Sequence, residues 1–234
     1  FAVAPEVAGI CDLIPVMNAG GAPVFVTHTG ADVAQARRAF DAGARHATHF
    51  YDVFPMPDEV DPGVRPAGVV EAVLADPRVS VDFILDGEHV NPVVVEMALR
   101  CKGPDRVCLI SDANIGAGFP PGAYTGLGGS EITFAYPGAP ARLTEKSHMP
   151  GALAGSGLTM DKAVRNALSF LPVDLPTAVR MASANPAQVL GLERRKGRID
   201  VGHDADLVIL DGNLEVRATY VGGRLVFDHR EDNS

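Results

Sequence analysis

Two histidines and one aspartate have the types and positions needed for hydrolysis assisted by a metal ion. His28 and His49 each end a short apolar run, and each follows a threonine. Imidazole is the most common neutral metal ligand, and the end of a strand holds it rigidly. Asp112 ends a third apolar run, and a carboxylate beside an activated water can accept its proton and pass it to a leaving amine. The three residues therefore predict two metal ligands and a catalytic carboxylate.

Each of these residues also has a structural interpretation. A single histidine is often a core or capping residue, and an aspartate after a strand often caps the next turn. The shared position at the ends of neighbouring strands favours the functional interpretation for His28, His49 and Asp112. His46 lies three residues before His49, so strand alternation places it on the opposite face, and we interpret it as structural.

Two further residues lie near predicted strand ends. His89 follows a strand that ends at Asp86-Gly87, where it could contact a substrate or cap the helix that starts at Asn91-Pro92. The sequence leaves both interpretations open. Glu6 also lies at a strand end, and a charge on the first turn of the following helix explains it at least as well.

These side chains need a fold that brings several strand ends together. Short apolar runs alternate with helical patterns, which is typical of βα units and a parallel sheet. An open doubly wound sheet also binds ligands at strand ends, but an α/β barrel gathers them on one face. We therefore expect a TIM-type (β/α)8 barrel. About half of its strands are visible, and the natural protein is expected to start upstream. The predicted strands are 23–28, 46–49, 79–85 and 106–112, and the predicted helices are 6–19, 31–42, 67–75 and 92–101.

The remaining segments predict additions to this barrel. Glycine-punctuated β-type runs near 123–145 predict an inserted hairpin, and helices are expected at 157–170 and 174–184. Short strands with turns follow from Lys196. We expect residues 1–190 to form the partial barrel and residues 191–230 to supply the C-terminal strands of a small β-sandwich domain.

Composition and charge exclude several classes of partner. The 234 residues are 47% hydrophobic and 21% charged, as in ordinary globular proteins. A net charge of −9 without Lys/Arg clusters argues against nucleic acid, and no apolar run is long enough for a membrane span. The three cysteines, Cys11, Cys101 and Cys108, contain no CxxC pair, so a reducing cytoplasm fits best.

The order and spacing of several segments resemble the amidohydrolase superfamily, and most closely its N-acetylglucosamine-6-phosphate deacetylase family. The resemblance covers nearly the whole chain, and its shared order makes it specific. The segments include Ala4-Pro5-Glu6, Thr27-His28-Thr29, Ala47-Thr48-His49-Phe50-Tyr51, Asp86-Gly87-Glu88-His89-Val90, Leu109-Ile110-Ser111-Asp112-Ala113 and Leu153-Ala154-Gly155-Ser156-Gly157.

The resemblance implies a role for each candidate residue. It implies that His28 and His49 bind a divalent metal and that Asp112 accepts and donates the proton. The family's third metal ligand is a glutamate on an earlier strand, expected upstream of residue 1, and Glu6 matches a later segment. A homodimer with shared active sites is also implied. The implied sugar-pocket residues are Asp86, His89, Leu153, Ala154 and Gly155, and the implied phosphate contacts are Asp52 and Val53.

Two departures from the family pattern concern the substrate. The family has Asn-Ala where this chain has Asp52-Val53, and it has a phosphate-clamping arginine where this chain has Val60. An anionic Asp52 without that arginine would weaken the binding of a phosphate, and Arg65 is the nearest substitute. The resemblance therefore supports the chemistry more strongly than the 6-phosphate preference.

Together these observations predict metal-dependent hydrolysis of the N-acetyl group of a small amino sugar. The products would be acetate and glucosamine-6-phosphate or a related amino sugar. Zinc suits two histidines and a carboxylate best, with iron and manganese as alternatives. Two other functions stay open: an amidohydrolase that acts on an unphosphorylated N-acyl or cyclic amide, and a non-catalytic relative. Retention of His28, His49 and Asp112 argues against the second.

Overall fold

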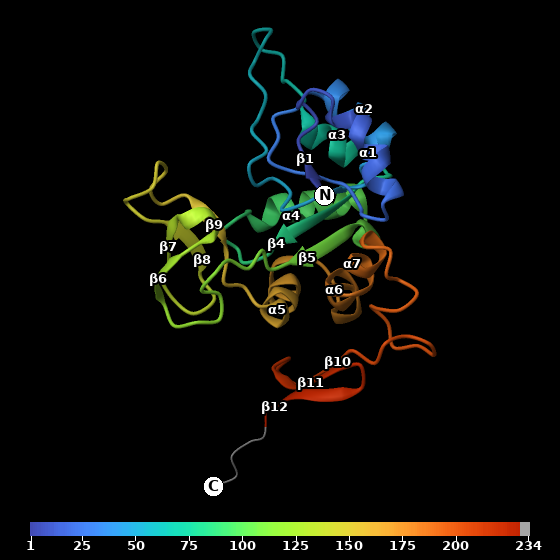
Figure 1. The fold of residues 1–234 in the computed structure, drawn as a ribbon, viewed down its shortest axis with the longest axis vertical. Helices are drawn as coiled ribbons and strands as arrows, with labels where there is room; N and C mark the ends of the chain where they lie inside the picture. The colour runs from blue at the N-terminus through green and yellow to red at the C-terminus, as the bar shows by residue number, and fades with distance from the viewer. Residues whose placement is uncertain (230–234) are drawn as a thin grey trace.

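The centre of the molecule is a parallel β-sheet, seen in the computed structural model, which describes residues 1–229 (Figure 1). Neighbouring strands are parallel throughout, with Phe25 opposite His46 and Val81 opposite Val107. The carboxyl ends of all five strands therefore lie at one edge of the sheet. The strands stand in chain order: β1 (Ala2–Val3), β2 (Phe25–Val26), β3 (His46–Ala47), β4 (Ser80–Ile84) and β5 (Val107–Ile110).

A helix follows each of the first four strands. Helix α2 begins at a capping box, in which the Asp32 side chain accepts from the Gln35 N–H and the Gln35 side chain accepts from the Asp32 N–H. It ends at Gly43, whose φ of 116° suits a residue without a Cβ. The helices are α1 (Ile10–Ala19), α2 (Val33–Ala42), α3 (Val69–Ala75) and α4 (Pro92–Lys102), and a short 3-10 helix, η1 (Pro104–Arg106), precedes β5.

Helix α1 begins four residues later than the pattern predicts. Gly9 has a left-handed φ of 79°, which cannot continue a right-handed helix, so the helix starts at Ile10 rather than Glu6. The interpretation of Glu6 as a first-turn charge is therefore wrong. Its carboxylate instead accepts hydrogen bonds from the Thr29 hydroxyl and from the Gly30 N–H, and so fastens the loop after β2.

The parallel sheet is buried within the hydrophobic core. All five residues of β4 are buried, including the polar Ser80 and Asp82. Strands that are covered on both faces lose the in-and-out alternation of an exposed sheet. Phe40 of α2, Phe50 after β3 and Phe83 of β4 are fully buried in the same core, and each such side chain contributes roughly 1.5–3 kcal/mol.

A second sheet occupies the segment between β5 and the later helices. Its strands are antiparallel, and a small core of Ile132, Phe134 and Ala141 lies on it. The expected hairpin near 123–145 falls within this four-stranded sheet. An isolated parallel bridge between Ala113 and Ser156 joins it to the end of β5. The elements are β6 (Gly122–Thr125), the 3-10 helix η2 (Leu127–Gly129), β7 (Glu131–Phe134), β8 (Pro140–Leu143) and β9 (Leu153–Ser156).

Three helices and a small sheet complete the described chain. The helices are α5 (Met160–Phe170), α6 (Leu175–Ala182) and α7 (Ala184–Val189), and all three contact β5. Strands β10 (Leu207–Leu210), β11 (Val216–Val221) and β12 (Arg224–Asp228) form an antiparallel sheet at the far end of the molecule (Figure 1). Arg165 of α5 donates to the Leu214 carbonyl at 2.7 Å. Residue 230 of the expected C-terminal segment lies outside the described residues.

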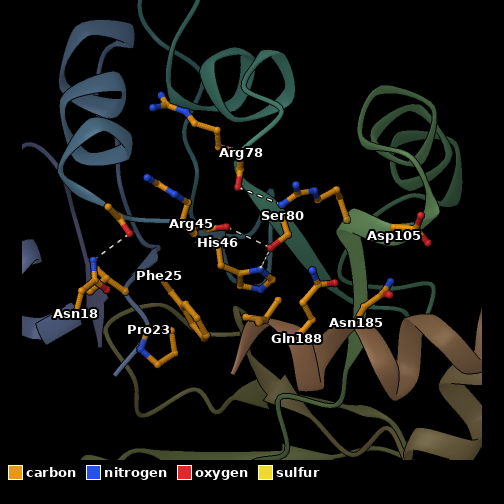
Figure 2. Close-up of a pocket in the computed structure, with 14 residues that line it drawn as sticks. Asn18, Pro23, Phe25, Arg45, His46, Arg78, Ser80, Asp105, Asn185 and Gln188 are labelled. Atoms are coloured by element: carbon orange, nitrogen blue, oxygen red, sulfur yellow. Dashed lines mark hydrogen bonds between the residues drawn. The ribbon is translucent and has the colours of Figure 1, made fainter. Parts of the chain in front are cut away.

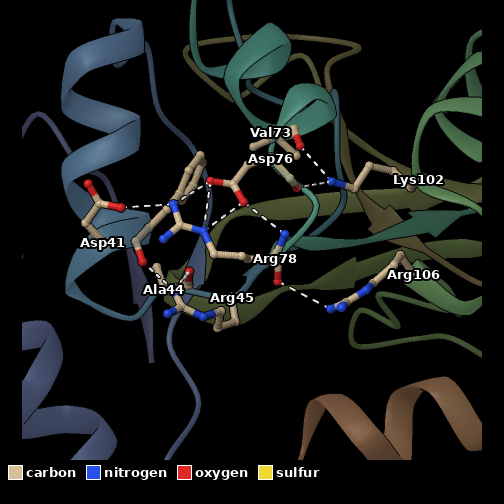
Figure 3. Close-up of polar contacts among 9 residues, drawn as sticks. Asp41, Ala44, Arg45, Val73, Asp76, Arg78, Lys102 and Arg106 are labelled. Carbon is tan, nitrogen blue, oxygen red and sulfur yellow. Dashed lines mark hydrogen bonds and ion pairs between the residues drawn. The ribbon is translucent and has the colours of Figure 1, made fainter.

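The amino ends of the parallel strands border a cavity of about 310 Å³, which His46 and Ser80 help to line (Figure 2). The turn after α3 carries a charged cluster nearby (Figure 3). The Arg78 guanidinium lies 2.6 Å from Asp76 and 2.9 Å from Asp41. Its hydrogen bonds hold the pKa of Asp76 at about 2. Lys102 donates to the Val73 carbonyl at 2.8 Å, so α4 is tied to α3.

The prediction of an α/β fold with a parallel sheet is confirmed. A closed barrel and a β-sandwich stay predictions, because the described strands form an open five-stranded sheet and a separate three-stranded one. None of the helices within residues 1–229 has the length and apolar character required to cross a membrane.

Candidate active site

A cavity of about 370 Å³ opens at the carboxyl ends of the parallel strands. His28 follows β2, His49 follows β3 and Asp112 follows β5, and all three line the cavity. Of the predicted site residues, only Asp86 does not line it, and Asp86 hydrogen-bonds to His89, which does. The other lining residues are Asp52, Val53, Ile84, Ala113, Asn114, Leu153, Ala154 and Gly155.

The two histidine rings approach each other through their Nε2 atoms, with their planes tilted by 57°. Nε2 of His28 lies 3.1 Å from Nε2 of His49, and the ring centroids are 4.7 Å apart. Burial and then the neighbouring His49 lower the pKa of His28, while Asp112 opposes the shift. The neutral imidazole of His28 is therefore favoured, and its nitrogen lone pair is what a metal ion binds.

The paired nitrogens fit two positions in the coordination sphere of a divalent metal. Nδ1 of His49 is buried and has no hydrogen-bond partner among the described residues, and its Nε2 lies 3.0 Å from the Thr27 hydroxyl. Within residues 1–229, no group of three or more His, Cys, Asp or Glu side chains could hold a metal ion. A protein metal site normally uses three or four ligands. The described chain thus supplies two nitrogen donors of the right chemistry.

The backbone is strained around this cavity. His28, His49 and Asp112 have φ values of 46°, 35° and 46°, and Tyr51 and Val53 have 80° and 54°. A residue with a Cβ gives up roughly 1–2 kcal/mol in this left-handed region. Such conformations persist only where the surrounding structure fixes them, and they cluster at functional sites.

A buried carboxylate beneath the cavity fixes the backbone of His49. Asp82 of β4 accepts hydrogen bonds from the His49 N–H, from the Thr48 hydroxyl at 2.9 Å and from Nε2 of His46 at 2.8 Å. Nδ1 of His46 lies 2.7 Å from Oγ of Ser80 (Figure 2). Asp82 and His46 are almost fully buried, so water cannot compete for these hydrogen bonds. The bond from the His49 N–H to Asp82 therefore holds His49 in its strained conformation.

Asp86 orients His89 toward the cavity. One carboxylate oxygen accepts from the backbone N–H groups of Glu88 and His89, and the other accepts from Nδ1 of His89 at 2.7 Å and from the Ser156 hydroxyl at 3.0 Å. Burial opposes ionisation of Asp86, but its hydrogen bonds with His89 and with the Glu88 N–H hold its pKa at about 2. Burial lowers the pKa of His89, and the hydrogen bond and charge of Asp86 outweigh that effect and raise it.

His89 can therefore donate a proton or a hydrogen bond into the cavity. Its side chain is only 3% exposed, and its Nε2 is buried without a hydrogen-bond partner among the described residues. With Nδ1 committed to Asp86, the imidazolium form directs an Nε2–H group at whatever occupies the cavity. The capping interpretation of His89 is wrong, because the side chain that caps helix α4 is Asn91. The contact between His89 and a substrate stays a prediction.

Asp112 is fixed by strand β9. Its carbonyl accepts from the Ser156 N–H at 2.9 Å, and the Asn114 N–H donates to the Ser156 carbonyl at 3.2 Å. Gly155 has a φ of 78°, and a Cβ at that position would lie 2.7 Å from the Asp112 carbonyl oxygen. Only glycine therefore permits β9 to approach Asp112 this closely.

Asp52 is a second carboxylate of the cavity, and it has an unsatisfied atom. Its backbone N–H donates to the His49 carbonyl at 2.9 Å, but its Oδ2 is buried and has no hydrogen-bond partner among the described residues. Burial raises the pKa of Asp52 to about 6. Val60 is 92% exposed, and Arg65 lies 3.8 Å from Glu71 and does not line the cavity.

Sequence reasoning missed four residues that support the site: Thr48, Asp82, Asn114 and Ser156. A signal existed for Asp82, because an aspartate inside the apolar run Val81–Ile84 needs buried partners. No local signal identifies Ser156, which meets Asp86 across 70 positions of the chain.

The open parallel sheet carries two histidines and an aspartate at its strand ends, and the family comparison identifies the class of protein to which this arrangement belongs. The model of the amidohydrolase family matches residues 24–226. The chain belongs to the amidohydrolase family.

Within that family the chain is similar to amino-sugar deacetylases. It is 37% identical to N-acetylglucosamine-6-phosphate deacetylase of Vibrio furnissii over 97% of this chain and 53% of the relative. It is 35% identical to N-acetylgalactosamine-6-phosphate deacetylase of Escherichia coli O157:H7 over 96% of this chain and 56% of the relative. The chain thus spans about half the length of the curated relatives it matches.

Solved structures give the same likeness. A mutant N-acetyl-D-glucosamine-6-phosphate deacetylase from Mycobacterium smegmatis, in complex with N-acetyl-D-glucosamine-6-phosphate, matches with a TM-score of 0.84 and 34% identity, over 96% of this chain and 56% of that one. The Thermotoga maritima N-acetylglucosamine-6-phosphate deacetylase also matches with a TM-score of 0.84, at 28% identity, over 97% of this chain and 58% of that one.

Proposed function

We propose that the protein containing this chain is a metal-dependent deacetylase that hydrolyses the N-acetyl group of an amino sugar. The observation that carries the proposal is the convergence of His28, His49, His89 and Asp112 on one cavity. Two ligand nitrogens, a carboxylate and a hydrogen-bond donor are the groups that amide hydrolysis needs. The likeness to curated amino-sugar deacetylases supports the same activity.

His28 and His49 would hold the metal, with zinc favoured by the nitrogen donors and iron or manganese as alternatives. A bound divalent metal would lower the pKa of a water molecule and would polarise the acetyl carbonyl. Asp112 accepts the proton of the attacking water and then delivers it to the departing amine. His89 donates its Nε2–H to the carbonyl oxygen, where negative charge develops. Asp86 keeps that donor protonated and aimed.

The same proposal extends to the architecture of the whole protein. Residues 1–190 would form part of a TIM-type barrel, with an insertion near 123–145, and residues 191–230 would belong to a small β-sandwich domain. The active unit would be a cytoplasmic homodimer. Leu153, Ala154 and Gly155 would contact the sugar, together with Asp52, Val53 and His89, because all six line the cavity.

Acetate release by the metal-loaded, full-length protein tests the activity, with N-acetylglucosamine and its 6-phosphate as substrates. Asp112→Asn should lower kcat by roughly 10²–10⁴, the usual contribution of a general acid–base group. His28→Gln should reduce bound metal in elemental analysis, whereas His148→Gln, at an exposed histidine, should not. Failure to release acetate from any N-acetyl sugar would overturn the proposal.

A further inference from the structure

The candidate cavity is lined by two carboxylates and, among the described residues, by no lysine or arginine. The two carboxylates are Asp52 and Asp112. Arg142 lies beside the neighbouring Glu88, with Nη2 3.3 Å from that carboxylate, and it does not line the cavity. A phosphate ester carries about −1.5 to −2 charges at neutral pH. Such a group would meet two carboxylates here and no lysine or arginine among the described residues, and His89 is already paired with Asp86 at 2.7 Å.

Asp52 is fixed in place and has capacity to accept one more hydrogen bond. Its N–H is bound to the His49 carbonyl, and the Val53 carbonyl accepts from the Thr29 N–H at 3.1 Å. The residues on either side, Tyr51 and Val53, have left-handed φ values, so the loop holds a defined shape. Yet Oδ2 of Asp52 is buried without a partner among the described residues. A buried carboxylate oxygen without a donor is costly, so the position fits a donor supplied by a ligand.

We infer that Asp52 is a specificity-determining residue that accepts a hydrogen bond from a free hydroxyl of the amino sugar. Together with Asp112 it disfavours a phosphate ester at that position. This inference rests on the proposed deacetylase function and narrows it: the substrate class is an N-acetyl amino sugar that presents a hydroxyl to Asp52. A hydroxyl satisfies Oδ2, while a phosphate adds like charge near two carboxylates. The protein would therefore prefer the unphosphorylated sugar, whereas the relatives to which the chain is similar are named as 6-phosphate deacetylases.

The test separates binding from turnover. Calorimetric titration of the metal-loaded, full-length Asp112→Asn protein, in which turnover is suppressed and Asp52 is the remaining carboxylate of the cavity lining, gives Kd for N-acetylglucosamine and for its 6-phosphate. The unphosphorylated sugar should bind more tightly by about tenfold or more, the usual effect of one charge-assisted hydrogen bond. Adding Asp52→Asn should erase that difference, because the amide cannot repel phosphate and offers one acceptor fewer. Adding Asp58→Asn instead should change neither Kd, since Asp58 is exposed and outside the cavity.

The outcomes of this test are distinct. Equal or tighter binding of the 6-phosphate, a binding ratio that Asp52→Asn leaves unchanged, or the absence of binding by either sugar would each overturn the inference. Tighter binding of the unphosphorylated sugar that depends on Asp52, with no acetate released by the wild-type protein, would uphold the recognition and refute the deacetylase chemistry. Turnover of both sugars with a preference for the 6-phosphate would uphold the chemistry and refute the role of Asp52.

Discussion

Replacing Asp82 by leucine should destabilise the protein by about 4 kcal/mol. The carboxylate accepts hydrogen bonds from the His46 ring, the Thr48 hydroxyl and the His49 N–H, and the site is almost fully buried. Each buried donor left without a partner costs about 1–3 kcal/mol, and removing one member of a buried pair costs about 3–5 kcal/mol in total. The loss is a large part of the 5–15 kcal/mol that stabilises a typical domain.

Asp82→Asn is the matched variant of similar shape. The amide oxygen can still accept from His49 and Thr48, and the amide NH₂ can donate to Nε2 of His46 once that ring takes the other tautomer. Nδ1–H of His46 can then donate to Ser80, whose hydroxyl lies 3.2 Å from the Arg45 carbonyl. We expect a loss of about 1 kcal/mol for this variant.

Urea unfolding followed by circular dichroism measures both losses, with Asp58→Leu on the exposed loop as the control, which should stay within about 0.5 kcal/mol of wild type. A second readout is metal affinity, because a loosened His49 should weaken it by about 10- to 100-fold. Equal losses for the leucine and asparagine variants, or a leucine variant within about 1 kcal/mol of wild type, would refute the reasoning about buried donors.

Two further predictions concern the support of Asp112 and of His89. Gly155→Ala should lower both the unfolding free energy and kcat, because the new Cβ would lie 2.7 Å from the Asp112 carbonyl oxygen. The control is Gly151→Ala, where φ is a similar 77° but a Cβ would meet open space. This control should lose only about 1–2 kcal/mol of unfolding free energy, which corresponds to backbone strain, with kcat unchanged. Equal effects of the two variants on kcat would contradict this. The pKa of Asp86 lies near 2 in the folded state against 3.8 for the free side chain, so its contribution of about 2 kcal/mol is complete above pH 4 and is lost as the pH falls toward 2. The difference in stability between wild type and Asp86→Asn should therefore shrink across that range in acid unfolding experiments, and a difference that stays constant would show that Asp86 is not the titrating group.

The sequence predicts the residues at the strand ends better than the residues that hold them in place. His28, His49 and Asp112 can be found because each ends an apolar run, and parallel strands place such ends at one edge. The start of α1 was missed because a single residue, Gly9, ends the turn in a left-handed conformation.

Other features depend on contacts between distant segments. The bond from Ser156 to Asp86 joins positions 70 residues apart, and the Asp82 network joins β3 to β4. Hydrophobic periodicity carries no information about such polar pairs, since it reports only which face is buried. The four-stranded sheet of β6–β9 was predicted as a hairpin for a related reason, because its last strand pairs across a turn of nine residues, 144–152.

The left-handed backbone at His28, His49 and Asp112 places function and thermal stability in opposition. At these three positions glycine would relieve the strain and remove the chemistry. Selection of variants for heat resistance alone would therefore tend to accept substitutions at the strand ends, whereas selection that also requires activity would reject them. The substitutions accepted at these positions would then show whether stability or activity had been selected.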